Sequence, residues 1–130
     1  MEGQRQKPTE AEWEVLQILW QNGPSTVRHV NDILNAKRRV GYTTTLKIMQ
    51  IMAEKDMLAR DESGRSHIYA PLLEERETQN VLLDRMLDTA FGGSALKLVM
   101  RALGSKKASK EELKAVRAYL DRIEREGEAP

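Results

Sequence analysis

The sequence of 130 residues has no cysteine and only two histidines, His29 and His67, which lie far apart along the chain. The absence of cysteine excludes disulfides, thiolate metal ligands and a cysteine nucleophile. The two histidines are not combined with carboxylates in the spacing that metal sites show. We therefore expect neither a metal nor another cofactor.

Long apolar runs and glycine-rich phosphate loops are also missing. No stretch approaches the ~20 apolar residues that cross a membrane, and the N-terminus lacks the apolar core of a signal peptide. No nucleophile has a base nearby in the sequence, and no plausible metal set accompanies one. The prediction is a small cytoplasmic protein that is not an enzyme.

The chain has no excess of charge of one sign, because 21 Lys and Arg residues face 20 Asp and Glu residues, giving a formal net charge of +1. A strong basic excess would by itself indicate nucleic-acid binding, so here local clustering has to carry that argument. The basic residues between residues 23 and 70 include Arg28, Lys37, Arg38, Arg39, Lys47, Arg60 and Arg65. Because their surplus is modest, affinity for DNA would depend on dimerisation, which doubles the phosphate contacts.

Two helices are predicted before residue 36. Thr9 and Glu12 form a capping-box pattern that opens the first, which runs to about Gln21 before the breaker Gly23-Pro24. Ser25 or Thr26 caps the second, whose apolar residues recur at three- and four-residue spacing. The basic turn at residues 37–39 then leads to a third helix.

The third helix begins at Thr43 or Thr44 as its cap and continues to Met57, with one face apolar. A helix that enters the major groove contacts bases from its N-terminal end, where threonine can bond a base edge or touch a thymine methyl group. Gln50 suits adenine, and Lys47 suits phosphate or guanine. Taken alone, a run of threonines before an apolar helix is more often just a cap.

A hairpin follows, with predicted strands at residues 58–60 and 66–70 joined around Gly64. The order of helix, turn, helix and hairpin is typical of a winged helix-turn-helix. Arg65 at the tip and Arg60 at the base are candidates for phosphate or minor-groove contacts, although an exposed arginine is often merely solvated. His67 is expected on the strand surface. The candidate DNA-binding residues are Thr43, Thr44, Lys47, Gln50, Arg28, Arg38, Arg39, Arg60 and Arg65.

Three further helices are predicted after Pro71, at residues 73–91, 94–103 and 109–125, with a frayed tail from Glu126. About 55 residues of this kind enclose only a modest core, so they need a partner. A twin copy is the simplest one, because two-fold homodimers are the commonest oligomers. The alternative is a monomer whose helices fold back on the hairpin domain. The candidate dimerisation residues are Val81, Leu82, Met86, Leu96, Val99, Leu103, Leu113, Val116 and Leu120.

These features together predict a mainly α fold with a small β-hairpin. Residues 1–72 would form a winged helix-turn-helix DNA-binding domain and residues 73–130 a helical dimerisation domain. The expected partners are double-stranded operator DNA and a second copy, with two recognition helices about one DNA turn, ~34 Å, or a multiple apart. The alternative is a protein-interaction module without sequence-specific DNA binding, since winged helices also pair with proteins.

Several motifs in this order resemble the penicillinase-repressor family of BlaI/MecI type. They are TEAEWEVL at residues 9–16 with Leu19-Trp20, YTT at 42–44, Gly64-Arg65, YAP at 69–71, FGGS at 91–94 and SKEEL at 109–113. The resemblance implies a homodimeric repressor that binds a palindromic operator, often with TACA and TGTA half-sites. By position, Thr43, Thr44 and Lys47 match the start of the family's recognition helix and Arg65 its wing.

The resemblance also implies regulation. Members tied to antibiotic resistance are inactivated by a membrane sensor system whose protease cuts an Asn-Phe bond in the C-terminal domain. Residues 94–103 contain no Asn-Phe pair, and copper-sensing relatives use cysteines that this chain lacks. A regulatory protease or membrane sensor is still an expected partner. Ile51 stands where many relatives have arginine, and it would meet a thymine methyl group or extend the core edge.

Overall fold

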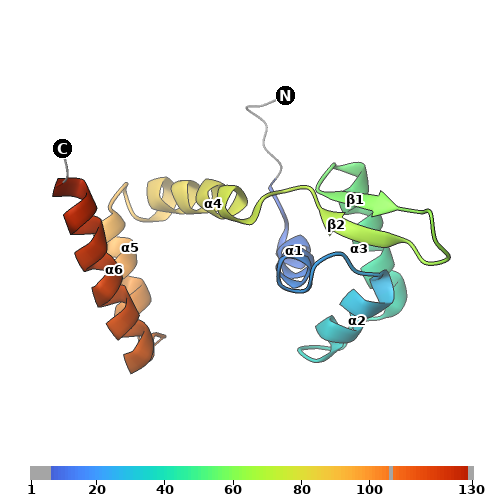
Figure 1. Cartoon of the computed structure of the whole chain (residues 1–130), viewed down its shortest axis with the longest axis horizontal. Coiled ribbons are helices and arrows are strands. Elements are labelled where there is room, and N and C mark those ends of the chain that lie inside the picture. The colour runs from blue at the N-terminus through green and yellow to red at the C-terminus, as the bar shows by residue number, and fades with distance from the viewer. Residues whose placement is uncertain (1–6, 106, 129–130) are drawn as a thin grey trace. The chain divides into compact units, whose positions relative to one another are not determined.

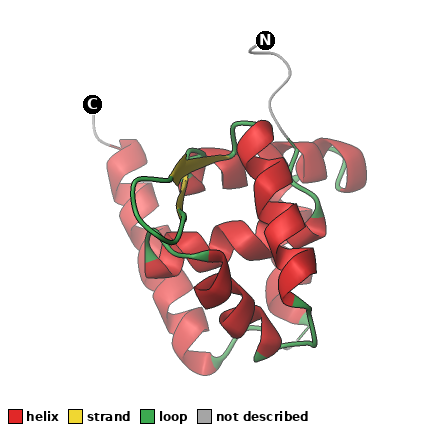
Figure 2. Ribbon diagram, turned by 90° about the vertical axis from the view of Figure 1, so that its right-hand side faces the viewer, coloured by secondary structure: helices red, strands yellow, loops and turns green. Residues whose placement is uncertain are grey.

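The computed structural model describes residues 7–105 and 107–128, and in these ranges the chain forms six helices and one short hairpin (Figure 1). Figure 2 shows how small the strand content of this mainly helical chain is. The elements are α1 (Glu10–Asn22), α2 (Val27–Asn35), α3 (Tyr42–Glu54), β1 (Leu58–Asp61), β2 (Ile68–Pro71), α4 (Glu75–Ala90), α5 (Ala95–Gly104) and α6 (Lys110–Glu128). No helix in these ranges has the length and apolar character that crossing a membrane requires.

The chain divides into two compact units, residues 1–82 and 83–130, and the division falls within α4. The first unit contains the predicted DNA-binding elements together with the start of α4. The second contains the rest of α4 with α5 and α6.

The predicted capping box of α1 is confirmed. The Thr9 N–H donates to Glu12 Oε1 at 2.9 Å, and the Glu12 N–H donates to Thr9 Oγ1 at 3.2 Å. Gly23, at φ 82°, ends the helix in the left-handed region, and its N–H donates to the Leu19 carbonyl. A glycine there avoids the strain that a side chain would meet at positive φ.

Thr26, one of the two predicted caps, caps α2, since its side chain accepts from the His29 N–H at 3.1 Å. Ser25 has another role. Its N–H donates to the Tyr69 carbonyl at 2.9 Å, and its own carbonyl accepts from the Tyr69 N–H at 2.8 Å. This short bridge joins the start of α2 to strand β2, so the helix and the hairpin are held together by backbone bonds.

The predicted cap of α3 by Thr43 or Thr44 was wrong. Gly41 occupies the N-cap position with extended backbone and no side-chain cap bond, and its carbonyl accepts from the Thr45 N–H at 3.2 Å. Both threonines therefore lie in the first turn of the helix, where they are exposed. At the other end, Asp56 adopts φ 63° and the Met57 N–H closes back on the Met52 carbonyl at 2.9 Å.

The hairpin is antiparallel, with Cα partners running from Leu58 opposite Pro71 to Asp61 opposite Ile68. The pairing stops at that last pair, so β2 begins at Ile68, and the prediction that Ser66 and His67 belong to a strand was wrong. Residues 62–67 form the connecting loop, and His67 lies at its end, next to β2. The side chains of residues 62–67 are therefore outside the strand pairing and can contact neighbouring helices.

The core of the first unit joins α1, α2, α3 and the hairpin. Its largest buried side chains include Leu16, Leu34, Met49, Met52 and Tyr69, each no more than 2% exposed. Apolar burial of this kind is the main stabilising contribution to a small domain. The core fixes the orientation of α3, because the buried methionines are on the face opposite its exposed residues.

The helix signals of the C-terminal part are largely confirmed. Ser94 caps α5 by accepting from the Lys97 N–H at 3.1 Å, and Ser109 and Glu112 form a reciprocal capping box that opens α6. Helix α4 begins at Glu75, two residues later than predicted. Its first turn is completed by the carbonyl of Glu74, which accepts from the Thr78 N–H at 2.9 Å.

The predicted fraying from Glu126 was wrong for the described residues, because α6 continues to Glu128. A single glycine in a helix costs only about 1 kcal/mol relative to alanine, and Gly127 is not enough to end it. Residues 129 and 130, the rest of the predicted tail, lie outside the described residues.

Candidate nucleic-acid interface

Helix α3 presents a polar face at its N-terminal end. Thr43, Thr44, Lys47 and Gln50 are all exposed, while Thr45 on the opposite face is fully buried. The exposed side chains combine hydroxyl, ammonium and amide groups, which are the types that contact base edges and phosphates. Ile51 is half-buried, which places it at the edge of the core.

The turn before α3 is held by two asparagines of α2. Asn31 Nδ2 donates to the Val40 carbonyl at 3.0 Å and to Thr45 Oγ1 at 2.7 Å. Asn35 Oδ1 accepts from the Val40 N–H at 3.2 Å, and its Nδ2 donates to the Val40 carbonyl at 2.8 Å. These bonds tie the end of the turn to α2 and so set the position of the first turn of α3.

The sequence analysis did not identify this positioning role of Asn31 and Asn35. The signal was present. Asparagines four residues apart share one helix face, and these two precede a non-helical turn whose backbone groups need partners. Buried backbone groups are nearly always paired, so the partners of Val40 had to be sought among nearby polar side chains.

Replacing Asn31 with alanine is expected to destabilise the first unit by about 1–3 kcal/mol, since Thr45 and the Val40 carbonyl would lose a donor in a buried setting. Urea denaturation of the variant would measure this loss. Asp32→Ala is the matched control, because Asp32 is the next residue and is exposed. Equal denaturation midpoints for the two variants would contradict the positioning role.

Arg38, in the basic turn, is engaged within the protein. Its guanidinium donates to the Glu14 carboxylate of α1, and this hydrogen bond is the main reason why the pKa of Glu14 is lowered. The stabilising contribution of the pair is therefore present at neutral pH and is lost as the pH falls through the lowered pKa of Glu14. Arg38 thus holds the turn against α1, and its neighbour Arg39 is exposed.

Arg60 is also paired, with its Nε 2.6 Å from Glu62 Oε2. Hydrogen bonding with Tyr69 and the charge of Glu62 raise the pKa of Arg60. Arg60 and Glu62 both line a cavity of about 470 Å³, and Gln50 and Glu54 line the same cavity. The two carboxylates make this end of the α3 surface less favourable for phosphate than the N-terminal end.

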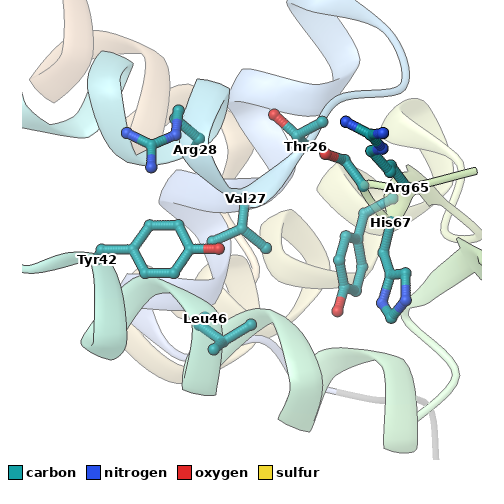
Figure 3. Close-up of a pocket in the computed structure, with 9 residues that line it drawn as sticks. Thr26, Val27, Arg28, Tyr42, Leu46, Arg65 and His67 are labelled. Atoms are coloured by element: carbon teal, nitrogen blue, oxygen red, sulfur yellow. The ribbon is translucent and has the colours of Figure 1, made fainter.

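A second cavity, of about 390 Å³, lies between α2, α3 and the hairpin loop. We call it the cationic cavity; its polar lining residues are Thr26, Arg28, Tyr42, Arg65, Ser66, His67 and Tyr69. Figure 3 shows Arg28 and Tyr42 on one side and Arg65 and His67 on the other. The Arg28 guanidinium lies 5.7 Å from the centroid of the Tyr42 ring.

The structure therefore sorts the candidate residues into groups. Thr43, Thr44 and Lys47 lie on the exposed start of α3, and Arg28 and Arg65 line one cavity beside it. Arg38 and Arg60 are instead held in ion pairs. Within the described residues, no group of three or more His, Cys, Asp or Glu side chains is arranged to hold a metal ion.

Comparison with known proteins gives two curated relatives, both named transcriptional regulator BlaI, from the CDC 1551/Oshkosh and H37Rv strains of Mycobacterium tuberculosis. Each is 32% identical over 82 residues, which are 62% of this chain and 59% of the relative. The matched segment thus spans about three fifths of the relatives' length. Their names are those of regulators and not of enzymes, in agreement with the prediction made from the sequence.

A MarR family protein from Bacillus stearothermophilus has a similar solved structure, with a TM-score of 0.55 and 20% sequence identity over 95% of this chain and 78% of that one. This similarity confirms the predicted winged-helix fold class. The sequence profile described as penicillinase repressor matches residues 8–122, nearly the whole chain. The chain belongs to the penicillinase repressor family.

Proposed function

We propose that the protein is a dimeric transcriptional repressor that binds a palindromic operator in the cytoplasm. Family membership supports regulation of transcription, and the relatives carry the name of a transcriptional regulator. The observation that carries the proposal is the exposed polar start of α3, at Thr43, Thr44 and Lys47, next to the arginines of the cationic cavity. Side chains of the types that can contact bases and phosphates thus lie on adjacent elements, which supports the proposal.

In this proposal α3 enters the major groove. Thr43 and Thr44 contact base edges or thymine methyl groups from the first turn. Lys47, one turn later, contacts a phosphate or a guanine, and Gln50 pairs with an adenine. Arg28, Arg39 and Arg65 contact phosphates. Arg38 and Arg60 contribute less, because each already has a carboxylate partner.

Dimerisation is supported by apolar side chains that the described part of the chain leaves exposed. Leu96 is 68% exposed, Leu120 is 54% exposed and Ile123 is 43% exposed. Leu120 and Ile123 share one face of α6 because they are three residues apart, and exposed apolar side chains that lie together mark interaction sites. A second copy covers these side chains and brings two recognition helices to one palindrome.

The direct test is fluorescence anisotropy on a duplex with the TACA/TGTA palindrome, compared with a scrambled duplex over a series of salt concentrations. Tight binding of two protomers to the palindrome alone, with a steep salt dependence, is the expected result. Equal and weak binding to both duplexes would contradict a repressor of this operator type. Selection from random DNA would then distinguish a diverged operator from a protein partner.

Lys47→Ala is expected to weaken operator binding by about 1–3 kcal/mol if Lys47 reads a base. The same anisotropy assay measures this change. Lys114→Ala, on exposed α6, is a control with the same change of charge outside the proposed interface. Unchanged affinity in the Lys47 variant would remove this residue from the interface.

Release of repression is proposed to follow an upstream signal, such as proteolysis in or near α5. Met100 is 60% exposed, Gly93 precedes the helix, and Gly104 is its last residue. A cut there would separate α6 from the rest of the chain. Full-length protein that has left the DNA under inducing conditions would exclude this mechanism.

A further inference from the structure

The cationic cavity contains one group that the proposed function has not used. His67 lies at the end of the hairpin loop, just before β2, and lines the cavity with Arg28 and Arg65. Figure 3 places His67 on the same side as Arg65, across from Arg28 and Tyr42. The cavity thus has basic side chains on opposing walls that come from different elements.

The side chains that line the cationic cavity carry the hydrogen-bond donors and positive charges that bind a phosphodiester. The hydroxyl groups of Thr26, Tyr42 and Ser66 supply neutral donors, and the guanidinium groups of Arg28 and Arg65 supply charged ones. None of the residues described as lining this cavity is a carboxylate, in contrast to the cavity at Glu54 and Glu62. An anion therefore meets attraction from several walls and no like charge among the lining side chains.

The position of the cavity indicates the source of that anion. It lies where the N-terminal ends of α2 and α3 meet the hairpin loop, beside the first turn that carries Thr43 and Thr44. A DNA strand whose bases are contacted by that turn brings its backbone phosphates within reach of the neighbouring elements. Its volume of about 390 Å³ gives room for a phosphate group with its bridging oxygens.

We propose that the cationic cavity seats one backbone phosphate of the operator and that His67 is a pH-dependent ligand of this phosphate. The inference rests on the proposed function and adds a regulatory property to the same interface. The other titratable groups facing His67 in the cavity are Arg28 from α2, Tyr42 from α3, Arg65 from the loop and Tyr69 from β2. Histidine side chains change charge between about pH 5 and 8, whereas these tyrosines and arginines belong to classes that keep their charge there.

The direction in which operator affinity changes with pH follows from the charge of His67. Protonation turns the imidazole into a cation with two donors, so the phosphate binds more tightly when His67 is protonated. Operator affinity therefore increases as the pH falls. One additional charge-assisted contact corresponds to about a tenfold increase in affinity for each protomer, and neutral His67 leaves the remaining contacts in place.

The test is operator anisotropy from pH 5.5 to pH 8 at constant ionic strength, with wild type, His67→Gln and His29→Gln. Wild type and His29→Gln should bind more tightly at low pH, while His67→Gln should give a flat profile. His29 is the matched control, since it is the other histidine, exposed on α2 and absent from the cavity lining. His67→Lys should keep the high affinity over the whole range.

The salt dependence gives a second readout. The slope of log affinity against log salt should be steeper at pH 5.5 than at pH 8, by up to about 0.9 for each protomer, in wild type but not in His67→Gln. A pH profile that persists in His67→Gln overturns the inference while leaving the repressor proposal intact. A wild type that fails to bind the palindrome at every pH refutes the repressor proposal itself.

A free anion is the other source of the same chemistry. Replacing chloride with inorganic phosphate at pH 6 and equal ionic strength should leave operator affinity unchanged, because an isolated phosphate lacks the adjoining base contacts. If a high concentration of inorganic phosphate competes with the operator in wild type but not in His67→Gln, both anions use the same seat, and the inference is supported. If inorganic phosphate shifts the imidazole signals of His67 in the operator complex without lowering operator affinity, the cavity is a site for free phosphate, and its assignment to the DNA backbone is overturned.

Discussion

Replacing Leu120 with aspartate is expected to convert the protein into a monomer and to remove tight operator binding. Leu120 lies on α6 in a stripe with Val116 and Ile123, and it is 54% exposed in the single chain. Burying a leucine side chain contributes about 1.5–3 kcal/mol, and a two-fold dimer contains two copies. The substitution also places a carboxylate in the apolar contact, so the dimer should weaken by at least about a hundredfold.

The physical link to DNA is the number of phosphate contacts. A protomer that binds alone makes half of them and reads one half-site, so both the affinity and the salt dependence should fall. Sedimentation equilibrium would measure the oligomeric state, and anisotropy on the palindrome the affinity. Circular dichroism during urea denaturation should show that the first unit stays folded, because this unit does not include α6.

Ala118→Asp is the matched control. Ala118 is exposed on the same helix, about 160° around its axis from Leu120 at ~100° per residue, and it receives the same charge. This variant should remain a dimer with unchanged operator affinity. A dimeric Leu120→Asp protein with normal affinity would place the interface on another surface.

The elements of this chain could be predicted from sequence where local chemistry determines them. The capping boxes at Thr9 and Ser109 and the cap at Ser94 each involve residues three positions apart, so the sequence shows both partners together. The spacing of apolar residues likewise identified the buried faces. Local signals of this kind fix where a helix begins and which side it buries.

The start of α3 illustrates the limit of that approach. Thr43 and Thr44 each have a side-chain oxygen that could accept a capping hydrogen bond, which glycine lacks, yet Gly41 takes the position. The reason is tertiary, because Asn31 and Asn35 hold Val40 and thereby determine where the turn ends. Contacts between α2 and the turn cannot be read from the local pattern around the threonines.

Prediction of the candidate site from the sequence was limited for the same reason. The sequence identified basic residues but not their partners, and the carboxylates of Glu14 and Glu62 are what hold Arg38 and Arg60. Glu12 shows the same limit at greater separation. It is 4% exposed and accepts from Lys55 at 2.8 Å, 43 residues away, although the sequence indicated only its capping role.

The largest stability effect is expected for Leu16→Ala. Leu16 is fully buried, and its helix α1 contacts α2, α3 and strand β2. Truncating a buried leucine to alanine costs about 2–5 kcal/mol, because apolar contacts are lost and a cavity is left behind. Since small domains are stable by only about 5–15 kcal/mol, the variant should lose a large share of its stability.

Urea denaturation followed by circular dichroism would measure this loss as a lower midpoint. Gln17→Ala is the matched control, since Gln17 is the next residue on α1 and is exposed, and its midpoint should stay close to that of wild type. Leu16→Met keeps nearly the same volume and should cost less than about 1.5 kcal/mol. If Leu16→Ala unfolded at the same midpoint as Gln17→Ala, α1 would not be an integral part of the core that orients α3, and the argument that this core positions the recognition helix would fail with it.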